Sequence, residues 1–96
     1  MRLKYSADIA KEMRVIFRYV RKNFGLKVAE RSIKNIYDNL DLLCKNPFMG
    51  KSCDRHDENF RQIFFKPNVI IYDINDEVIE ILHIVDARMD YVTNLL

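Results

Sequence analysis

Three strand-like runs between residues 59 and 90 constrain the fold more than any other feature of the chain. They span residues 60–65, 69–74 and 78–85. Each run is rich in aromatic and β-branched residues, which is typical of strands. Pro67 interrupts the chain between the first two runs. Asn75-Asp76 turns it between the last two, and a two-residue turn of this type favours a hairpin. The sequence therefore predicts an antiparallel meander.

The second and third runs do not alternate cleanly between apolar and polar residues. Ile70 is followed by Ile71, and Ile81 by Leu82, so each strand places apolar side chains on both faces of the sheet. A half-solvated antiparallel sheet has one polar face instead. We therefore expect the second face to be covered, either by residues 91–96 of the same chain or by another protein.

The N-terminal half has the period of two helices. Apolar residues recur at three- and four-residue steps from Ile9 to Phe24, and Gly25 ends this first helix. The same stepping begins again at Leu26 and ends at Asn46-Pro47, because a residue before proline disfavours the helical conformation. Ser6 or Asp8 is expected to cap the first helix.

These elements predict an α+β fold in the order β-α-α-β-β-β. Residues 1–5 alternate and supply a short edge strand. The two helices have a short connection and form an antiparallel hairpin, which packs on one face of a small antiparallel sheet. Residues 48–58 are expected to form a surface loop. A short C-terminal tail or helix completes a single domain of residues 1–96.

The composition excludes several classes of protein. No run approaches the roughly 20 apolar residues of a membrane helix, and residues 1–10 lack the apolar core of a signal peptide. A cytoplasmic location is therefore expected. Cys44, Cys53, His56 and His83 are scattered without the spacing of a metal site. We expect free thiols, no metal, no cofactor and no small-molecule ligand.

The charges are divided unevenly along the chain. Residues 1–52 hold 12 Lys and Arg against 5 Asp and Glu, whereas residues 53–96 hold 4 against 9. In the first helix the basic residues fall on a stripe away from the apolar face. This basic stripe consists of Lys11, Arg14, Arg18, Arg21 and Lys22. It suits an acidic partner, either nucleic acid or an acidic protein segment.

Two residues near the end of the last run have both a functional and a structural interpretation. Arg88 lies between Asp86 and Asp90. It either contacts phosphate or a target protein, or forms a local ion pair that fixes the turn after the strand. His83 is either an acid or base, because its ordinary pKa lies near neutrality, or a hydrogen-bonded core histidine.

One residue of the first run and one of the second also have two possible interpretations each. Arg61 either has an active role or forms a salt bridge with Asp57, Glu58 or Glu80. Tyr72 is first a candidate for the core and second a candidate for contact with a partner.

Five features in this order resemble a known family. They are Pro47 and Gly50 after the second helix, Arg61 opening a strand, Tyr72 inside the next strand, and the ending ILHIVDARMD over residues 81–90. In order and spacing the chain resembles the RelE/ParE superfamily of bacterial toxin–antitoxin toxins. The resemblance implies a small toxin that an antitoxin holds inactive and that halts growth when the antitoxin is degraded.

The RelE-like branch of this superfamily cuts mRNA on the ribosome. Its chemistry, attack of a ribose 2′-hydroxyl on the adjacent phosphate, needs a base, an acid and cations. Arg88 matches that branch's strand-end arginine, but Asn94 stands where the branch has a tyrosine, and Tyr91 would have to replace it. The catalytic set under this alternative is Arg61, Lys66, Arg88 and Tyr91.

The ParE-like branch resembles the chain in its RMD-type ending and implies DNA gyrase as the target class. We favour this branch, and therefore a toxin that binds a macromolecule rather than hydrolysing one. The antitoxin is expected to lie across the sheet and the first helix. The residues expected to contact antitoxin or target are Arg14, Arg18, Arg61, Tyr72, His83 and Arg88.

Overall fold

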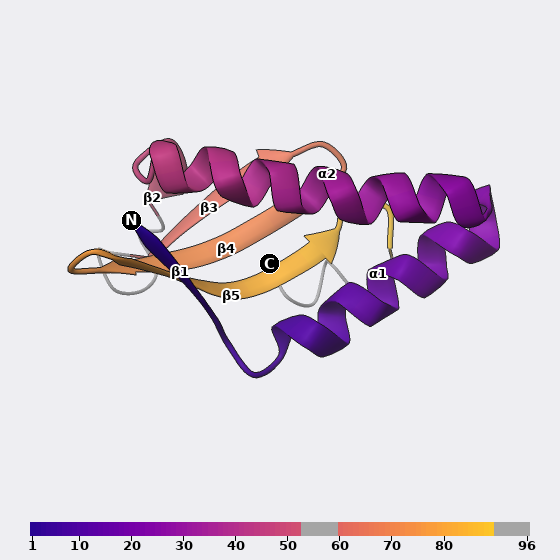
Figure 1. Cartoon of the computed structure of the whole chain (residues 1–96), viewed down its shortest axis with the longest axis horizontal. Helices are drawn as coiled ribbons and strands as arrows, with labels where there is room; N and C mark the ends of the chain where they lie inside the picture. The colour runs from indigo at the N-terminus through magenta and orange to yellow at the C-terminus, as the bar shows by residue number, and fades with distance from the viewer. Residues whose placement is uncertain (53–59, 90–96) are drawn as a thin grey trace.

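The computed structural model describes residues 1–52 and 60–89 (Figure 1). Its elements are β1 (Arg2–Tyr5), α1 (Ile9–Phe24), α2 (Leu26–Lys45), β2 (Lys51–Ser52), β3 (Phe60–Phe65), β4 (Asn68–Asn75) and β5 (Val78–Asp86). The predicted α+β class and the order of the six predicted elements are confirmed. The short strand β2 lies inside the segment predicted as a loop, whose residues 53–58 are outside the described part of the chain.

The strands form one sheet in the order β1-β5-β4-β3-β2. β3, β4 and β5 pair antiparallel, as the predicted meander requires. The prediction of a wholly antiparallel sheet is wrong for one pairing, because β1 runs parallel to β5, with Arg2 opposite Val78 and Tyr5 opposite Ile81. The alternation of residues 1–5 identifies a strand but not its direction. A parallel neighbour needs a long crossover, and the chain between β1 and β5 contains both helices and the strands β2, β3 and β4.

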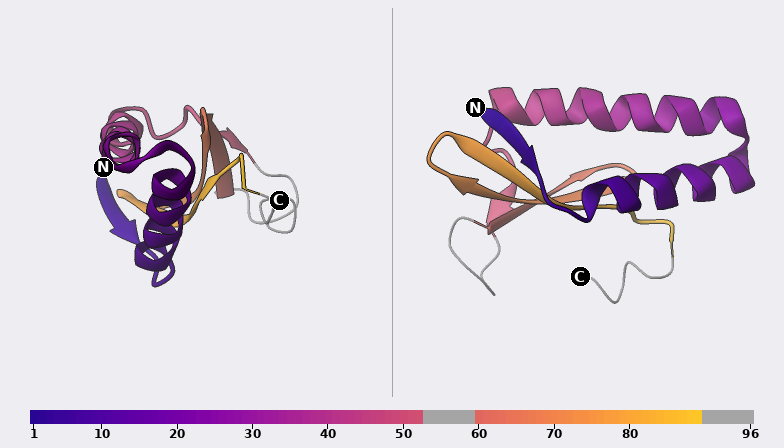
Figure 2. Two further views of the ribbon diagram at one scale, coloured as in Figure 1. Left: turned by 90° about the vertical axis from the view of Figure 1, so that its right-hand side faces the viewer. Right: turned by 60° about the horizontal axis from the view of Figure 1, so that its bottom comes forward.

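Both helices cover one face of the sheet, so this prediction is confirmed (Figure 2). Apolar side chains from α1, α2, β4 and β5 form a single core there. Its fully buried members include Ile16, Val20, Ala29, Ile36, Ile70, Tyr72, Ile79, Ile81 and Ile84. The three- and four-residue steps in the helices and the two-residue steps in the strands bring these side chains to one layer.

A second, smaller apolar cluster lies on the other face of the sheet. It consists of Val69, Ile71 and Val85, with Leu82 and Met89 partly buried against it. Ile70 and Ile71 therefore serve opposite clusters, as do Ile81 and Leu82, which confirms that β4 and β5 are apolar on both faces. Val69, Ile71 and Val85 are already buried, so the centre of this face is not open surface. The tail proposed to cover it, residues 91–96, lies outside the described residues.

The ends of α1 differ in one respect from the prediction. Gly25, with φ of 94°, separates α1 from α2 as expected, because this conformation suits a residue without a Cβ. At the other end, Asp8 occupies the cap position but makes no side-chain hydrogen bond to the helix. The Ser6 hydroxyl instead donates to the Leu82 carbonyl at 3.0 Å, so Ser6 ties the start of α1 to β5. The predicted cap by either side chain is wrong.

The hairpin between β4 and β5 turns one residue later than predicted. Asn75 is still paired with Val78, and the turn is made by Asp76 and Glu77. Asp76 has φ of 54°, a left-handed conformation that aspartate adopts more readily than most residues. The turn therefore uses the aspartate of the predicted pair but not the asparagine.

Candidate functional site

Arg88 and Asp86 form a tight pair at the end of β5. Asp86 is the last residue of the strand and its side chain is 1% exposed. Its Oδ1 accepts hydrogen bonds from the Arg88 backbone N–H and from Nε, both at 2.9 Å, and its Oδ2 accepts one from Nη2 at 2.6 Å. Such two-pronged pairing is the strongest contact that a guanidinium makes with a carboxylate. These hydrogen bonds raise the pKa of Arg88, and the partial burial of the guanidinium opposes the rise.

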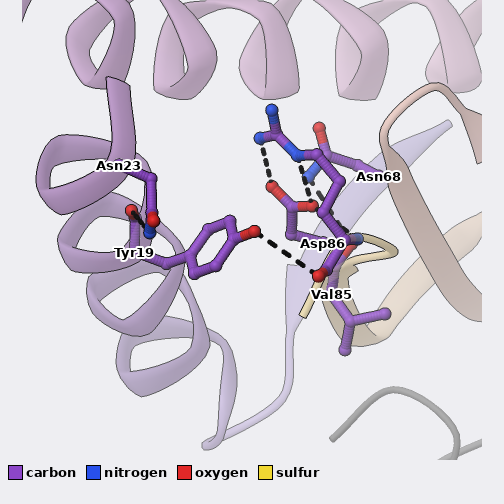
Figure 3. A network of polar contacts seen from close by, with 6 residues as sticks. Tyr19, Asn23, Asn68, Val85 and Asp86 are labelled. Carbon is purple, nitrogen blue, oxygen red and sulfur yellow. Dashed lines mark hydrogen bonds and ion pairs between the residues drawn. The ribbon is translucent and has the colours of Figure 1, made fainter. Parts of the chain in front are cut away.

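Two aromatic side chains of α1 lie against the same guanidinium. The Cζ of Arg88 is 4.7 Å from the centre of the Phe24 ring and 5.8 Å from that of Tyr19. The Tyr19 hydroxyl donates to the Arg88 carbonyl at 3.4 Å, and Figure 3 shows Tyr19 reaching from its helix toward the strand end that carries Asp86. The Arg88 side chain remains 36% exposed and Phe24 48% exposed. The end of α1 and the end of β5 thus share one surface.

The β3–β4 turn and the start of β4 also hold the end of β5, through one side-chain and one backbone hydrogen bond. The buried Asn68 stands opposite Asp86 in the sheet, and its Nδ2 donates to the Val85 carbonyl at 3.5 Å (Figure 3). The Ala87 N–H donates to the Pro67 carbonyl at 2.8 Å. The β3–β4 turn, which also carries the exposed Lys66, therefore packs beside the Arg88 segment. The structural interpretation of Arg88, a local ion pair, is confirmed for Asp86, whereas Asp90 lies outside the described residues.

Pro47, Gly50, Arg61 and Tyr72, which suggested the family resemblance, form one hydrogen-bonded cluster. The Tyr72 hydroxyl donates to the Pro47 carbonyl at 2.9 Å and accepts from the Gly50 N–H at 3.0 Å. Arg61 donates through Nη1 to the Gly50 carbonyl at 2.7 Å, and its Cζ is 5.0 Å from the centre of the Phe48 ring. This Tyr72 cluster folds the loop after α2 onto β3 and β4.

The cluster confirms the first interpretation of Tyr72, as a core residue, and excludes one of the salt-bridge partners predicted for Arg61. Tyr72 is fully buried, and this burial raises the pKa of its hydroxyl, so it is placed in the core and not at a surface that a partner reaches. Arg61 stands opposite Tyr72 in the sheet and bonds to the Gly50 carbonyl rather than to Glu80. The other predicted partners of Arg61, residues 57 and 58, lie outside the described part of the chain.

His83 is bound to α1. Its Nδ1 lies 2.7 Å from Oε2 of Glu12, and the other oxygen of Glu12 accepts the Ile84 backbone N–H at 2.9 Å. Glu12 therefore accepts a backbone N–H on the edge of β5 at a position beyond the last residue paired with β1. The histidine is hydrogen-bonded as one interpretation expected, but its side chain is 36% exposed, so it lies at the rim and not in the core.

The basic stripe of α1 projects into solvent as predicted. Lys11, Arg14, Arg18, Arg21 and Lys22 are all exposed. None of these five cations forms an ion pair with any other residue that the structure describes. The stripe therefore presents a row of exposed positive charges on one face of α1.

An apolar groove that the sequence did not predict lies beside this stripe. α1 and α2 meet at Gly25 and diverge toward β1 (Figure 1), and the opening between them holds a cavity of about 390 Å³. Its walls include Tyr5, Met13, Tyr37, Leu40 and Ile84. Tyr5 and Tyr37 are 45% and 51% exposed, which is high for aromatic side chains next to a core. The sequence does not reveal this groove, because the exposure of Tyr5 and Tyr37 depends on the angle at which the two helices diverge.

The residues of the nuclease alternative do not converge within the described part of the chain. Arg61 and Lys66 stand near opposite ends of β3, about 17 Å apart at the usual rise of a strand. Lys66 lies near Arg88 through the Pro67–Ala87 contact, but Arg61 is held by the loop after α2. Tyr91 lies outside the described residues.

Across residues 1–52 and 60–89, no three His, Cys, Asp or Glu side chains gather as metal ligands would. In the same ranges neither helix is long and apolar enough to cross a bilayer.

Comparisons with known proteins agree on one family. Residues 3–91 match the family model described as ParE toxin of type II toxin-antitoxin system, parDE. Toxin ParE3 of Caulobacter vibrioides is 34% identical over 82 residues, which cover 83% of this chain and 80% of that protein. A chain from a solved structure of the chromosomal ParDE TA system from P. aeruginosa has the same fold, with a TM-score of 0.75 at 18% identity over 90% of this chain and 95% of that one.

These findings define the class of protein as a small toxin of a toxin–antitoxin system. Within that class, the chain belongs to the ParE toxin family. The predicted resemblance to the RelE/ParE superfamily, with the ParE-like branch favoured, is confirmed.

Proposed function

We propose that this toxin arrests growth in the cytoplasm by binding a macromolecular target, with DNA gyrase as the candidate, and that a cognate antitoxin neutralises it. The observation that carries the proposal is the match to the ParE family over residues 3–91. The separation of Arg61 from Arg88 supports binding over hydrolysis, because the cations of a nuclease must converge on one phosphate.

The basic stripe and the groove beside it are the proposed antitoxin surface. The five exposed cations of the basic stripe attract an acidic segment, and the groove with Tyr5 and Tyr37 accepts apolar side chains from the same segment. An amphipathic helix or strand with acidic residues on one side fits both features. Arg14 and Arg18 stay proposed contacts for this reason. The similar chain from P. aeruginosa comes from a structure described as a ParDE TA system, and this description supports a protein partner for the present chain.

The surface around Arg88 is the proposed target contact. It joins a guanidinium to two aromatic rings at the junction of α1 and β5. Arginine and aromatic residues are enriched among the residues that dominate binding energy at protein interfaces. His83 lies farther back on β5, engaged by Glu12, and is proposed only as a rim contact.

Inducible expression tests the toxin and antitoxin parts together. We expect the chain alone to stop growth and co-expression of the adjacent reading frame to restore it, because the antitoxin would cover the free cations and the groove. The Arg14→Glu/Arg18→Glu variant should still stop growth but resist rescue. Unimpaired growth on expression of a soluble, folded chain would contradict the proposed function.

A further inference from the structure

We infer that Asp86 is a positioning residue: its buried carboxylate holds the Arg88 guanidinium against Phe24 and Tyr19, so that these groups form one fixed contact surface for a protein target. The inference rests on the proposed function, since it assigns chemistry to the proposed target surface. It adds a residue that does not itself reach the surface, because the Asp86 side chain is 1% exposed.

The hydrogen bonds determine which part of the guanidinium faces outward. Asp86 occupies Nε and one position of Nη2. Nη1 is then left as the edge that a ligand oxygen can approach, and the side chain is 36% exposed. An unrestrained surface arginine loses considerable rotamer entropy when a partner orders it. The pairing with Asp86 removes that freedom beforehand, which is the way preorganisation favours binding.

The charges indicate the chemistry of the partner. The Asp86 carboxylate and the Arg88 guanidinium form a local pair with no net charge, so the pair itself adds no net positive charge that would attract a phosphate. Two aromatic rings lie against the guanidinium, those of Tyr19 and of Phe24, and Phe24 is 48% exposed. A carbonyl or carboxylate oxygen beside an apolar side chain fits this mixture, and it is typical of a protein segment rather than a nucleic-acid backbone.

Isosteric removal of the Asp86 charge tests the positioning role. Asp86→Asn keeps the size of the side chain and one acceptor, and it removes a buried charge rather than stranding one. We expect a melting temperature within a few degrees of the wild type. The distinct Arg88 Nε–H signal should disappear from ¹H–¹⁵N spectra. Growth arrest should require at least ten times more inducer than for the wild type. Asp38→Asn is the matched control. It breaks the exposed pair with Lys34 and should change neither signal nor growth arrest.

Phe24→Ala provides a second variant on the exposed side of the same surface. It should keep the melting temperature and weaken growth arrest as Asp86→Asn does. A folded Asp86→Asn chain with the wild-type Nε–H signal or wild-type growth arrest would overturn the inference. If the wild-type chain itself fails to arrest growth, the proposed function fails, whereas the Nε–H signal still decides whether Asp86 positions Arg88. Tight binding of the wild type to a short DNA duplex that Phe24→Ala abolishes would overturn the choice of a protein partner.

Discussion

The hydroxyl of Tyr72 lies directly over Gly50, accepting its backbone N–H at 3.0 Å and donating to the Pro47 carbonyl at 2.9 Å. A Cβ added at Gly50 would collide with this hydroxyl and with two ring carbons of Tyr72. The glycine is therefore required by a close approach between a loop and a strand. This relationship explains why Pro47, Gly50 and Tyr72 occur together: they build one corner of the fold.

Gly50→Ala is expected to destabilise the chain by about 1–3 kcal/mol, because either the loop or the Tyr72 ring must move in a packed interior. Urea unfolding followed by circular dichroism measures the change in the free energy of unfolding. Lys51→Ala, one residue away and exposed, is the control and should change it by less than about 0.5 kcal/mol. Equal stability of both variants would mean that the loop is not held as described.

The stability of the chain should fall above pH 10 partly because of Tyr72. Burial raises the pKa of its hydroxyl above the usual 10.0. The unfolded chain then loses its proton at lower pH than the folded chain, so the free energy of unfolding decreases as the pH rises past about 10. Tyr5, whose pKa is raised mainly by burial, adds to this slope. Unfolding titrations at several alkaline pH values should show a shallower slope in Tyr72→Phe than in the wild type. An unchanged slope in Tyr72→Phe would contradict the contribution of Tyr72.

Removing either partner of the Arg88–Asp86 pair should have unequal effects. Arg88→Ala leaves the buried Asp86 without its cation and should cost about 2–4 kcal/mol, somewhat below the value for a fully buried pair because Arg88 is partly exposed. Asp86→Asn should cost less. The double variant should recover part of the stability lost in Arg88→Ala, and a double-mutant cycle by urea unfolding measures the coupling. Strictly additive effects would show that the two groups do not interact in solution.

The same double variant tests how Asp86 acts on growth arrest. In the Asp86→Asn background, Arg88→Ala no longer strands a buried carboxylate. If Asp86 acts by holding Arg88, the double variant should arrest growth about as weakly as Asp86→Asn alone, whereas a further large loss would show that Arg88 still makes its contact without Asp86.

Glu12 is expected to anchor α1 to β5. Glu12→Ala removes the acceptor of the Ile84 N–H and the partner of His83, and it should cost about 1–3 kcal/mol. Glu12→Gln retains an acceptor and should cost less. Hydrogen exchange of the Ile84 amide provides the local readout, since it should accelerate in Glu12→Ala. Glu30→Ala, on the exposed face of α2, is the control, and an unaffected Ile84 amide would contradict the anchoring role.

Charge reversal on the basic stripe should weaken antitoxin binding without unfolding the chain. Arg14→Glu/Arg18→Glu is expected to lower the affinity at least tenfold and to flatten its salt dependence, because exposed charges attract over a screening length of about 10 Å at 0.1 M salt. Titration calorimetry with the cognate antitoxin at two salt concentrations gives both quantities. Lys27→Glu, an exposed change on α2, should have a smaller effect, and identical affinities for all three chains would exclude the stripe from the interface.

The sequence predicts most of the fold because its periods are strong. Helical stepping ends at Gly25 and at Asn46-Pro47, and the structure confirms both boundaries within one residue. The direction of β1 relative to β5 cannot be predicted in the same way, because alternation of apolar and polar residues is the same in a parallel and an antiparallel strand. The turn at Asp76 and the irregular register at Ile71 and Tyr72 depend on pairing across strands, which a single chain segment does not encode.

The candidate site was only partly predictable. Arg88 and Asp86 are two residues apart, and their pairing was one of two interpretations that the sequence allowed. Phe24 and Tyr19 lie more than 60 positions away, and only the packing of α1 beside β5 brings them to the guanidinium. The sequence predicts Tyr72 first for the core and second for contact with a partner, because a tyrosine in an apolar strand suits either place. Its hydrogen bonds to the loop decide for the core.

Inhibition of gyrase supercoiling by the purified chain is the decisive measurement of the proposed target. We expect the chain to inhibit supercoiling in a dose-dependent way, the antitoxin to relieve this inhibition, and mRNA on programmed ribosomes to stay intact. Cleavage of that mRNA by the wild-type chain, lost in a folded Arg88→Ala variant and accompanied by normal supercoiling, would contradict gyrase binding and establish the nuclease alternative.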